Sequence, residues 1–219
     1  MAETSLAGRK KIAVIGAGSW GTALAMVAAR NSHSVCLWGR DQRVADEINR
    51  SHKNPVHLSD FELPQNITAT TSLELATAEA DSVVVVVPSH VFREVTGKLR
   101  DHLRPDTLLV SATKGVENGT LMRMSEVVAD VLGPDFGTRF VALSGPSFAR
   151  EVAQGDPTAI VAASQNPRAS ETVQQELSCA VFRIYTNSDT VGVELGGAVK
   201  NVVAIAAGVV RGLGMGTNS

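Results

Sequence analysis

Lys200 is the only basic residue in the stretch GVELGGAVKNVVAIAAG, residues 192–208. If this stretch is a helix, the ammonium stands on an apolar face, because the neighbours one turn away are Gly196, Gly197, Val203 and Ala204. A desolvated amine has a lowered pKa and can exchange a proton near neutral pH. The alternative is a lysine whose stem covers apolar surface while its head reaches water. The two glycines favour proton transfer, since they leave room for a ligand beside the amine.

Three glycines in IAVIGAGSWGTALA, residues 12–25, have the spacing G-x-G-x-x-G between an apolar strand pattern and a helical pattern. Gly16 would allow a tight turn, Gly18 would let a pyrophosphate approach, and Gly21 would allow close packing of helix on sheet. The start of the helix would offer free N–H groups to the phosphates. A glycine-rich turn without a ligand is the alternative, but the strand–turn–helix context favours dinucleotide binding. Ser19 and Trp20 should then contact the cofactor.

The cofactor is NADP or NAD, and the end of the second strand bears on the choice. The sequence LWGRD places Arg40 where a guanidinium suits the extra phosphate of NADP, after Gly39, which leaves space. Asp41 follows, and an acidic residue near this point suits the ribose of NAD. We favour NADP. The alternative for Arg40 is a solvated cation at the start of a helix.

Two further segments end strands on the side where parallel sheets bind ligands. TLLVSATK, residues 107–114, ends a strand with Lys114, which would face the cofactor or its substrate, or else lie in an exposed turn. In ALSGPSFAREV, residues 142–152, Gly145 begins a turn and Ser147 takes the position of a helix N-cap. The N–H groups at this helix start could also hold a small polar substrate.

Strand and helix patterns alternate through the first 189 residues. This alternation predicts an α/β fold, a doubly wound and mainly parallel sheet of Rossmann type. The strand patterns cover residues 10–16, 33–39, 66–71, 81–88, 107–114, 139–145, 157–164 and 181–188; the helical patterns cover residues 20–31, 42–51, 90–103, 121–133, 147–153 and 169–180. From residue 190 the alternation stops and one long Gly/Ala/Val helix follows. Either a second subunit, in a homodimer, covers its apolar surface, or the chain is incomplete.

The composition is that of a globular protein, with 44% hydrophobic and 19% charged residues among 219. A net charge of −2 gives no general attraction for nucleic acid. Cys36 and Cys179 lie in apolar runs and should be small buried hydrophobic residues without a disulfide framework. We expect a reducing cytoplasm, no signal peptide, no membrane span and no metal site.

Seven blocks in consistent order resemble the bacterial-type NAD(P)-dependent glycerol-3-phosphate dehydrogenases: GAGSWGTALA, VVPSHVF, SATKGVE, SGPSFAREV, PTAI, FRIYTN and GVELGGAVKNVVAIAAG. The resemblance runs from about residue 10 to the last residue. It implies an oxidoreductase that interconverts sn-glycerol 3-phosphate and dihydroxyacetone phosphate and so feeds phospholipid synthesis. It also implies two domains, an NAD(P)-binding Rossmann-like domain over residues 1–189 and the start of an all-α substrate domain over residues 190–219.

The resemblance also implies roles for single residues. Lys200 matches the proton acceptor of the oxidation direction, and Lys114 matches a catalytic lysine that contacts both cofactor and substrate. The other matched positions are cofactor contacts at Ser19, Trp20, Arg40 and Ala149, and substrate contacts at Gly145, Ser147 and Asn201. Family members continue into a longer helical domain that supplies an aspartate and an arginine–asparagine pair. We therefore expect this chain to be an incomplete form with impaired turnover.

Two other functions compete with this interpretation. One is a hydroxyacid-type or imine-type dehydrogenase with a Rossmann domain and a helix lysine, but such enzymes would lack the SGPSFA and SATKG blocks. The other is a fragment that binds NAD(P) without catalysis. Nucleic-acid binding is set aside because the sequence has no basic stripe.

Overall fold

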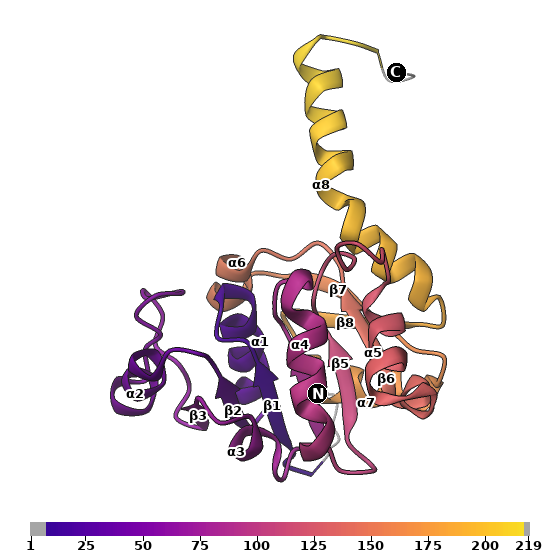
Figure 1. Ribbon diagram of the computed structural model, residues 1–219. Coiled ribbons are helices and arrows are strands. Elements are labelled where there is room, and N and C mark those ends of the chain that lie inside the picture. Colours follow the sequence, from indigo (N-terminus) through magenta and orange to yellow (C-terminus); the bar gives the residue numbers. More distant parts are fainter. Residues whose placement is uncertain (1–7, 217–219) are drawn as a thin grey trace.

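The structure is a computed structural model that describes residues 8–216, and these residues form one eight-stranded sheet with helices on both faces (Figure 1). Along the sheet the strands follow the order β3-β2-β1-β4-β5-β6-β7-β8. The strands are β1 (Lys11–Ile15), β2 (Ser34–Trp38), β3 (Ile67–Thr70), β4 (Ser82–Val85), β5 (Leu108–Ser111), β6 (Phe140–Ser144), β7 (Thr158–Ala163) and β8 (Phe182–Asn187). The first six strands have the order that is typical of Rossmann folds.

Strands β1 to β6 are parallel, and the direction changes once, between β6 and β7. There Ala142 pairs with Ala163 and Ser144 with Val161 in an antiparallel ladder. Strand β8 runs parallel to β7, so both end at the opposite side of the sheet from β1 to β6. Strand β4, with the sequence SVVV, is buried along its whole length, as expected for a strand covered on both faces.

The helices in the described chain are α1 (Ser19–Arg30), α2 (Gln42–Ser51), α3 (Leu73–Thr77), α4 (Ser89–Leu99), α5 (Met124–Leu132), α6 (Ala149–Gln154), α7 (Pro167–Leu177) and α8 (Thr190–Gly212). Helices α1, α6 and α7 pack on one face of the sheet, where Leu24, Val152 and Val173 share one apolar cluster with Val110 of β5. Helices α4 and α5 cover the other face through Phe92 and Val127. Each face of the sheet therefore has its own hydrophobic core.

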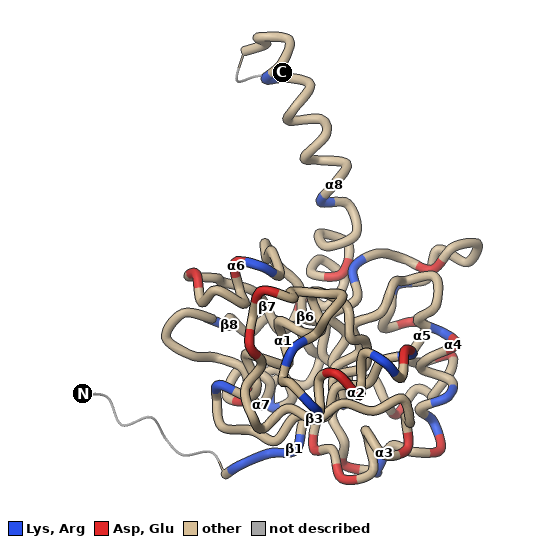
Figure 2. The backbone as a smooth tube through the Cα atoms, turned by 90° about the vertical axis from the view of Figure 1, so that its left-hand side faces the viewer, with Lys and Arg blue, Asp and Glu red and all other residues tan. Residues whose placement is uncertain are grey.

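Helix α8 begins beside the sheet and extends beyond it (Figure 1). Asp189 caps its start by accepting a hydrogen bond from the N–H of Gly192, and the helix then packs against β6. Its second half is exposed and almost free of charged residues (Figure 2). By length and composition alone α8 could cross a membrane. No span is expected from the sequence, because Glu194, Lys200 and Arg211 interrupt the apolar run.

The alternation and the mainly parallel sheet predicted from the sequence are confirmed. Helix α3 is missing from the prediction, because five residues are too few to show a helical period. Strand β5 ends at Ser111, so the prediction that Lys114 ends the strand is wrong, and Lys114 lies in the following loop. Cys36 and Cys179 are half-buried at the edges of the two cores rather than fully buried.

The predicted N-cap role of Ser147 is also wrong. Helix α6 begins at Ala149, and Phe148 occupies the N-cap position without a side-chain hydrogen bond. The Ser147 hydroxyl instead lies 3.2 Å from the Lys114 ammonium, which donates to it. The N-cap therefore lies one residue later than the sequence pattern predicts.

Candidate functional site

Gly16 and Gly21 of the G-x-G-x-x-G segment have the structural roles that the spacing predicts, and Gly18 has open space beside it. Gly16 has a φ of +127°, and a Cβ there would lie 2.2 Å from the carbonyl oxygen of Val86. A Cβ on Gly21 would lie 1.8 Å from the carbonyl oxygen of Gly16. A Cβ on Gly18 would meet no atom within 4 Å, so this glycine faces open space. Two glycines are thus required by the fold, and Gly18 is left for a ligand.

The start of α1 is open to an anion. Gly18 is the N-cap, and within residues 8–216 no side chain caps the first N–H groups of the helix. Unpaired N–H groups and the helix dipole together attract phosphate. This geometry fits the pyrophosphate of a dinucleotide.

Trp20 connects this loop to the rest of the site. Its ring lies 6.5 Å from that of Phe182 and 5.8 Å from the Lys114 ammonium, measured between ring centroids and from the centroid to Nζ. Its Nε1 is buried and has no hydrogen-bond partner within residues 8–216. Ser19 Oγ lies 3.3 Å from Nδ1 of His57. His57 was not among the predicted site residues, because it belongs to the irregular segment 51–66, whose fold no local pattern reveals.

Arg40 is exposed after β2, and its neighbour Asp41 is engaged elsewhere. Asp41 caps α2 by accepting from the N–H of Arg43, and its Oδ2 lies 2.9 Å from Nη2 of the same arginine. These contacts with Arg43 lower the pKa of the Asp41 carboxyl. The two charges of that pair compensate each other. Arg40 forms no ion pair within residues 8–216, although its charge, after the hydrogen bond from Lys98, helps to lower the pKa of the Glu94 carboxyl.

Lys114 is half-buried and points toward the loop that follows β6. Its Nζ donates to the carbonyl oxygen of Gly145 at 3.0 Å as well as to Ser147. Gly145 has a φ of +151° and a Cβ there would lie 2.9 Å from the Cα of Ile160, so no other residue fits. Burial, and secondly the charge of Lys200, lower the pKa of the Lys114 ammonium. The Lys114 ammonium therefore loses its proton more easily than the ammonium of a solvated lysine.

A cleft of about 540 Å³ lies between α8, the carboxyl end of β6 and the middle of β7. It is lined by Lys114, Ser144, Gly145, Pro146, Ser147, Phe148, Val161, Gly192, Val193, Gly196, Gly197, Lys200, Asn201 and Ala204. All five residues predicted to bind substrate are in this set. Two ammonium groups and no carboxylate line the cleft, which favours an anionic ligand.

Lys200 lines the cleft but is exposed, and it donates a hydrogen bond to Oδ1 of Asn201 at 2.9 Å. The burial predicted for Lys200 is therefore wrong for the described chain, and it is found at Lys114 instead. The helical neighbours of Lys200 are small or apolar as the sequence indicates; Gly197 packs closely against Ser144, whereas Val203 is exposed. Gly196 faces open space, as expected if it leaves room for a ligand.

The other predicted cofactor residues do not line this cleft. Ala149 begins α6, directly after Phe148, and packs against the first core. Gly16, Gly18, Ser19, Trp20 and Gly21 form the loop and the start of α1, and Arg40 follows β2.

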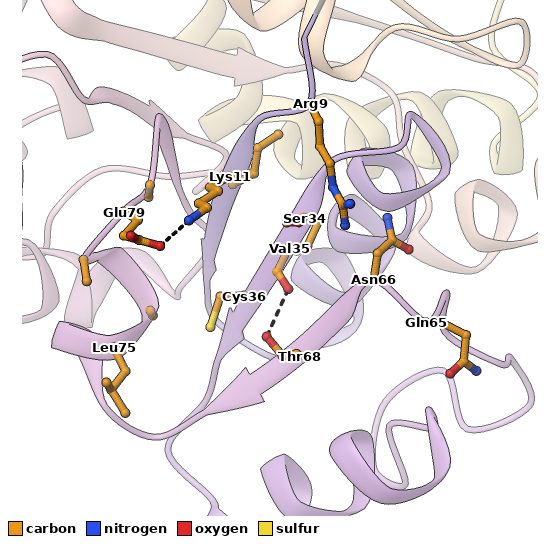
Figure 3. Close-up of a pocket in the computed structure, with 14 residues that line it drawn as sticks. Arg9, Lys11, Ser34, Val35, Cys36, Gln65, Asn66, Thr68, Leu75 and Glu79 are labelled. Atoms are coloured by element: carbon orange, nitrogen blue, oxygen red, sulfur yellow. Dashed lines mark hydrogen bonds and ion pairs between the residues drawn. The ribbon is translucent and has the colours of Figure 1, made fainter.

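A second, larger hollow of about 610 Å³ lies at the opposite end of the sheet (Figure 3). Lys11, Ser34 and Asn66 line it at the amino ends of β1, β2 and β3, where Lys11 pairs with Glu79. Ligands of open parallel sheets bind at the carboxyl ends. We therefore assign the site to the cleft beside α8.

Comparison with known proteins agrees with the fold and the motifs. The family model for the N-terminus of NAD-dependent glycerol-3-phosphate dehydrogenase matches residues 11–170, and the model for its C-terminus matches residues 189–219. The chain is 51% identical over 210 residues to glycerol-3-phosphate dehydrogenase [NAD(P)+] of Koribacter versatilis, covering 95% of this chain and 62% of that protein. It is 50% identical to the enzyme of Syntrophotalea carbinolica, with the same coverage.

Solved structures give the same result. Glycerol-3-phosphate dehydrogenase from Coxiella burnetii superposes with a TM-score of 0.85 at 38% identity, over 96% of this chain and 63% of that one. The chain thus spans about 62% of the length of the curated relatives it matches. With both family models matched in order and half of the residues identical to those of the bacterial relatives, the chain belongs to the NAD-dependent glycerol-3-phosphate dehydrogenase family.

Proposed function

We propose that this protein interconverts sn-glycerol 3-phosphate and dihydroxyacetone phosphate with NAD(P)(H), and thereby feeds glycerophospholipid synthesis. One observation carries the proposal: Lys114 and Lys200 line a single cleft without a carboxylate, next to a glycine loop built for a dinucleotide. A phosphorylated three-carbon substrate is a small anion and fits this charge. The names of the relatives support the same reaction.

In the proposed reaction, hydride transfer, proton transfer and charge stabilisation are carried out by different groups. The nicotinamide, when bound, supplies or accepts the hydride. Lys200 gives a proton to the carbonyl oxygen during reduction and takes it from the hydroxyl during oxidation. Lys114, held by Gly145 and Ser147, places positive charge beside the same oxygen and stabilises its developing negative charge. Asn201 accepts from Lys200 and orients it.

The dinucleotide would be held by Gly18, Ser19, Trp20 and the first N–H groups of α1, with Gly16 and Gly21 shaping the loop and Ala149 beside it. NADP is the favoured form. Asp41 is committed to Arg43 and to the N-terminus of α2, so its charge opposes a 2′-phosphate only weakly, while Arg40 is available to bind one.

The assembly and location follow from the same proposal. A homodimer or the further chain of a longer product would cover the exposed apolar residues of α8, such as Val202 and Ile205. Helix α8 acts inside the site rather than in a membrane, because Gly197 and Lys200 line the cleft. The cytoplasm is the proposed compartment.

The test is consumption of NADPH with dihydroxyacetone phosphate. It compares the chain, and any longer product of its reading frame, with Lys200→Ala and with Lys53→Ala, an exposed lysine away from the cleft. Turnover that Lys200→Ala abolishes and Lys53→Ala keeps supports the proposal. Binding of NADPH without any turnover of this substrate, by every form tested, identifies a non-catalytic NAD(P)-binding protein instead.

A further inference from the structure

Glu194 is the most enclosed charged side chain of α8, and its carboxylate is fully engaged. The side chain is only 6% exposed. Its Oε2 accepts from Nη1 of Arg123 at 2.9 Å and from Oγ of Ser125 at 2.6 Å, while its Oε1 accepts from the N–H of Ser125 at 2.7 Å. All three donors lie in one short segment at the start of α5. Nothing in the dehydrogenase mechanism above uses this carboxylate.

The donors belong to a helix start that suits an anion. Arg123 is the N-cap residue of α5, and Ser125 lies in the first turn, where N–H groups have no partner within the helix. A carboxylate at this point is stabilised by the helix dipole as well as by its hydrogen bonds. Glu194 therefore fastens α8 to the N-terminus of α5.

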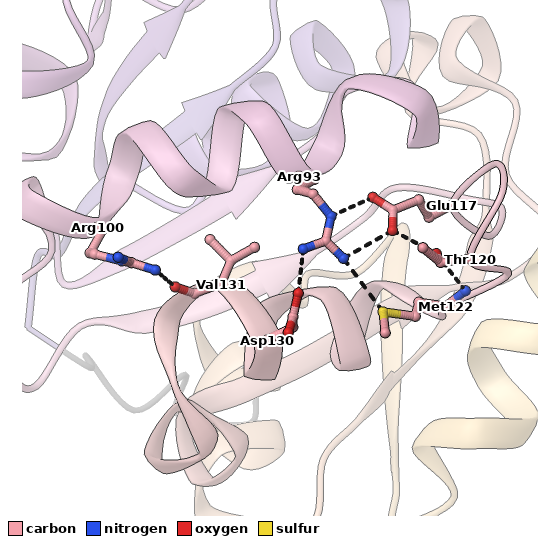
Figure 4. Close-up of polar contacts among 7 residues, drawn as sticks. All are labelled: Arg93, Arg100, Glu117, Thr120, Met122, Asp130 and Val131. Atoms are coloured by element: carbon pink, nitrogen blue, oxygen red, sulfur yellow. Dashed lines mark hydrogen bonds and ion pairs between the residues drawn. The ribbon is translucent and has the colours of Figure 1, made fainter.

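The same segment is continuous with the loop that carries Lys114. An antiparallel bridge between Val116 and Arg123 closes a hairpin, residues 116–123, that begins two residues after Lys114. On its other side the hairpin is held by Arg93 of α4, which pairs with Glu117 and with Asp130 of α5 (Figure 4). The hairpin thus joins α4 and α5 to α8.

Beyond Glu194, α8 approaches the sheet closely but forms no side-chain hydrogen bond to it within residues 8–216. A Cβ on Gly197 would lie 2.5 Å from Oγ of Ser144 and 3.8 Å from Cγ of Lys114. Within residues 8–216, Glu194 is the only side chain of α8 that forms a hydrogen bond to another helix or strand. Lys200 follows six residues later, about 9 Å along the helix axis.

Two ammonium groups that face one cleft repel each other. Without a polar attachment, α8 would be held only by Val193, which packs against the second core, and by the close approach of Gly197 to β6, and it would lean away from Lys114. We propose that Glu194 is a positioning residue that locks α8 to the hairpin 116–123 and so sets the separation of Lys114 and Lys200 across the cleft. That this separation matters for catalysis rests on the proposed function; that Glu194 holds α8 to the hairpin does not.

The experiment measures the pKa of the Lys114 amine in Glu194→Gln. The lysines are reductively methylated with a ¹³C label, titrated by NMR, and the Lys114 signal is assigned with Lys114→Arg. Glu171→Gln is the matched control, because Glu171 is an exposed carboxylate on α7. Circular dichroism confirms that each variant is folded.

We expect the pKa of Lys114 to rise in Glu194→Gln toward its ordinary value and to stay unchanged in Glu171→Gln. Release of α8 removes both the nearby charge of Lys200 and part of the burial that lower the pKa of Lys114. Ser125→Ala removes one of the three hydrogen bonds and should give a smaller rise, and it replaces Glu194→Gln if that variant does not fold. An unchanged or lowered pKa in a folded variant overturns the proposal.

This readout does not depend on turnover. If the pKa of Lys114 rises but dihydroxyacetone phosphate is not reduced, the positioning role of Glu194 is supported and the proposed reaction is wrong. Where turnover is measurable, the lock predicts that Glu194→Gln lowers kcat more than it raises the KM for NADPH. The dinucleotide loop lies on α1, away from α8.

Discussion

The Lys114 ammonium lies 5.8 Å from the centre of the Trp20 ring, although the two residues come from different halves of the sheet. This is within the range of a cation–π interaction. Trp20 stands at the glycine loop and Lys114 stands at the cleft beside α8. The two parts of the candidate site therefore form one continuous surface, as hydride transfer between a dinucleotide and a small substrate requires.

The glycine loop gives a first prediction. Gly18→Ala should leave the melting temperature unchanged, because a Cβ there meets no atom, but should weaken NADPH binding about tenfold or more by obstructing the pyrophosphate. Gly21→Ala forces a Cβ onto the carbonyl oxygen of Gly16 and should destabilise the fold by about 1–3 kcal/mol. Thermal unfolding and fluorescence titration measure both. Equal loss of stability in the two variants would contradict this assignment.

Cofactor choice gives a second prediction. Arg40→Ala should weaken NADPH binding by about 2 kcal/mol, roughly thirtyfold, and NADH binding little, because only NADPH carries a phosphate for a charge-assisted hydrogen bond. Arg183→Ala is the matched control, since Arg183 is an exposed arginine on β8, at the far edge of the sheet from β2. Titration with both cofactors measures the effect. Equal losses for NADH and NADPH in Arg40→Ala remove the argument for NADP.

A third prediction concerns Glu176, which is buried on α7 and accepts from Oγ of Ser82 at 2.7 Å. Burial raises the pKa of its carboxyl to about 7, while Ser82 and Lys10 lower it and Asp81 raises it. Below pH 4.5 the carboxyl is protonated in both the folded and the unfolded state, so it does not change the free energy of unfolding. As the pH rises from 4.5 to 7 the unfolded chain ionises first, so the folded state loses up to about 3 kcal/mol.

Glu176→Gln removes this loss, and its stability relative to wild type should grow between pH 4.5 and 7 and then level off. The difference in the free energy of unfolding between variant and wild type reports on Glu176 and not on His33, because His33 is present in both proteins. Burial lowers the pKa of His33, so that its contribution to stability falls as the pH falls. Urea unfolding across this range measures the difference. A difference that does not vary with pH would show that Glu176 is solvated.

A fourth prediction concerns the hairpin 116–123. Hydrogen bonds from Arg93 and Thr120 lower the pKa of Glu117 to about 2. The stabilisation they provide is complete above pH 4.5 and is lost as the pH falls toward 2. Glu117→Gln should therefore open the hairpin at neutral pH, seen as faster hydrogen exchange at the N–H of Glu117, which donates to the carbonyl of Met122. Equal exchange rates in the variant and wild type would show that backbone bonding alone holds the hairpin.

The fold class and the glycine roles could be predicted because both are properties of local sequence. The spacing of Gly16, Gly18 and Gly21 is fixed by one turn between a strand and a helix. Strand–helix alternation likewise predicts a parallel sheet. The reversal at β7 could not be predicted, because a six-residue strand has the same pattern in either direction.

The sequence predicted which residues line the cleft, but not how buried each of them is. Lys114 and Lys200 meet in one cleft as expected, yet Lys114 has the burial expected for Lys200. A helical pattern identifies neighbours on the same helix and says nothing about what lies opposite. The roles of His57 and Glu194 were missed for the same reason, since each depends on a partner at least 38 residues away in sequence.

The reversal of the last two strands has a mechanical consequence. Because β8 runs antiparallel to β6 and its last residue, Asn187, is level with Ala142 through Ala163, α8 passes along the carboxyl-terminal half of β6 before it leaves the body. Its side-chain hydrogen bonds to other elements within residues 8–216 lie only near its start. The helix is then a lever arm with its pivot at Glu194. A tilt of about 5° would move the Lys200 backbone about 0.8 Å and the end of the helix, about 27 Å from the pivot, about 2.4 Å. A contact at the outer end of α8 would therefore shift Lys200 at the cleft by less than about 1 Å for such a tilt.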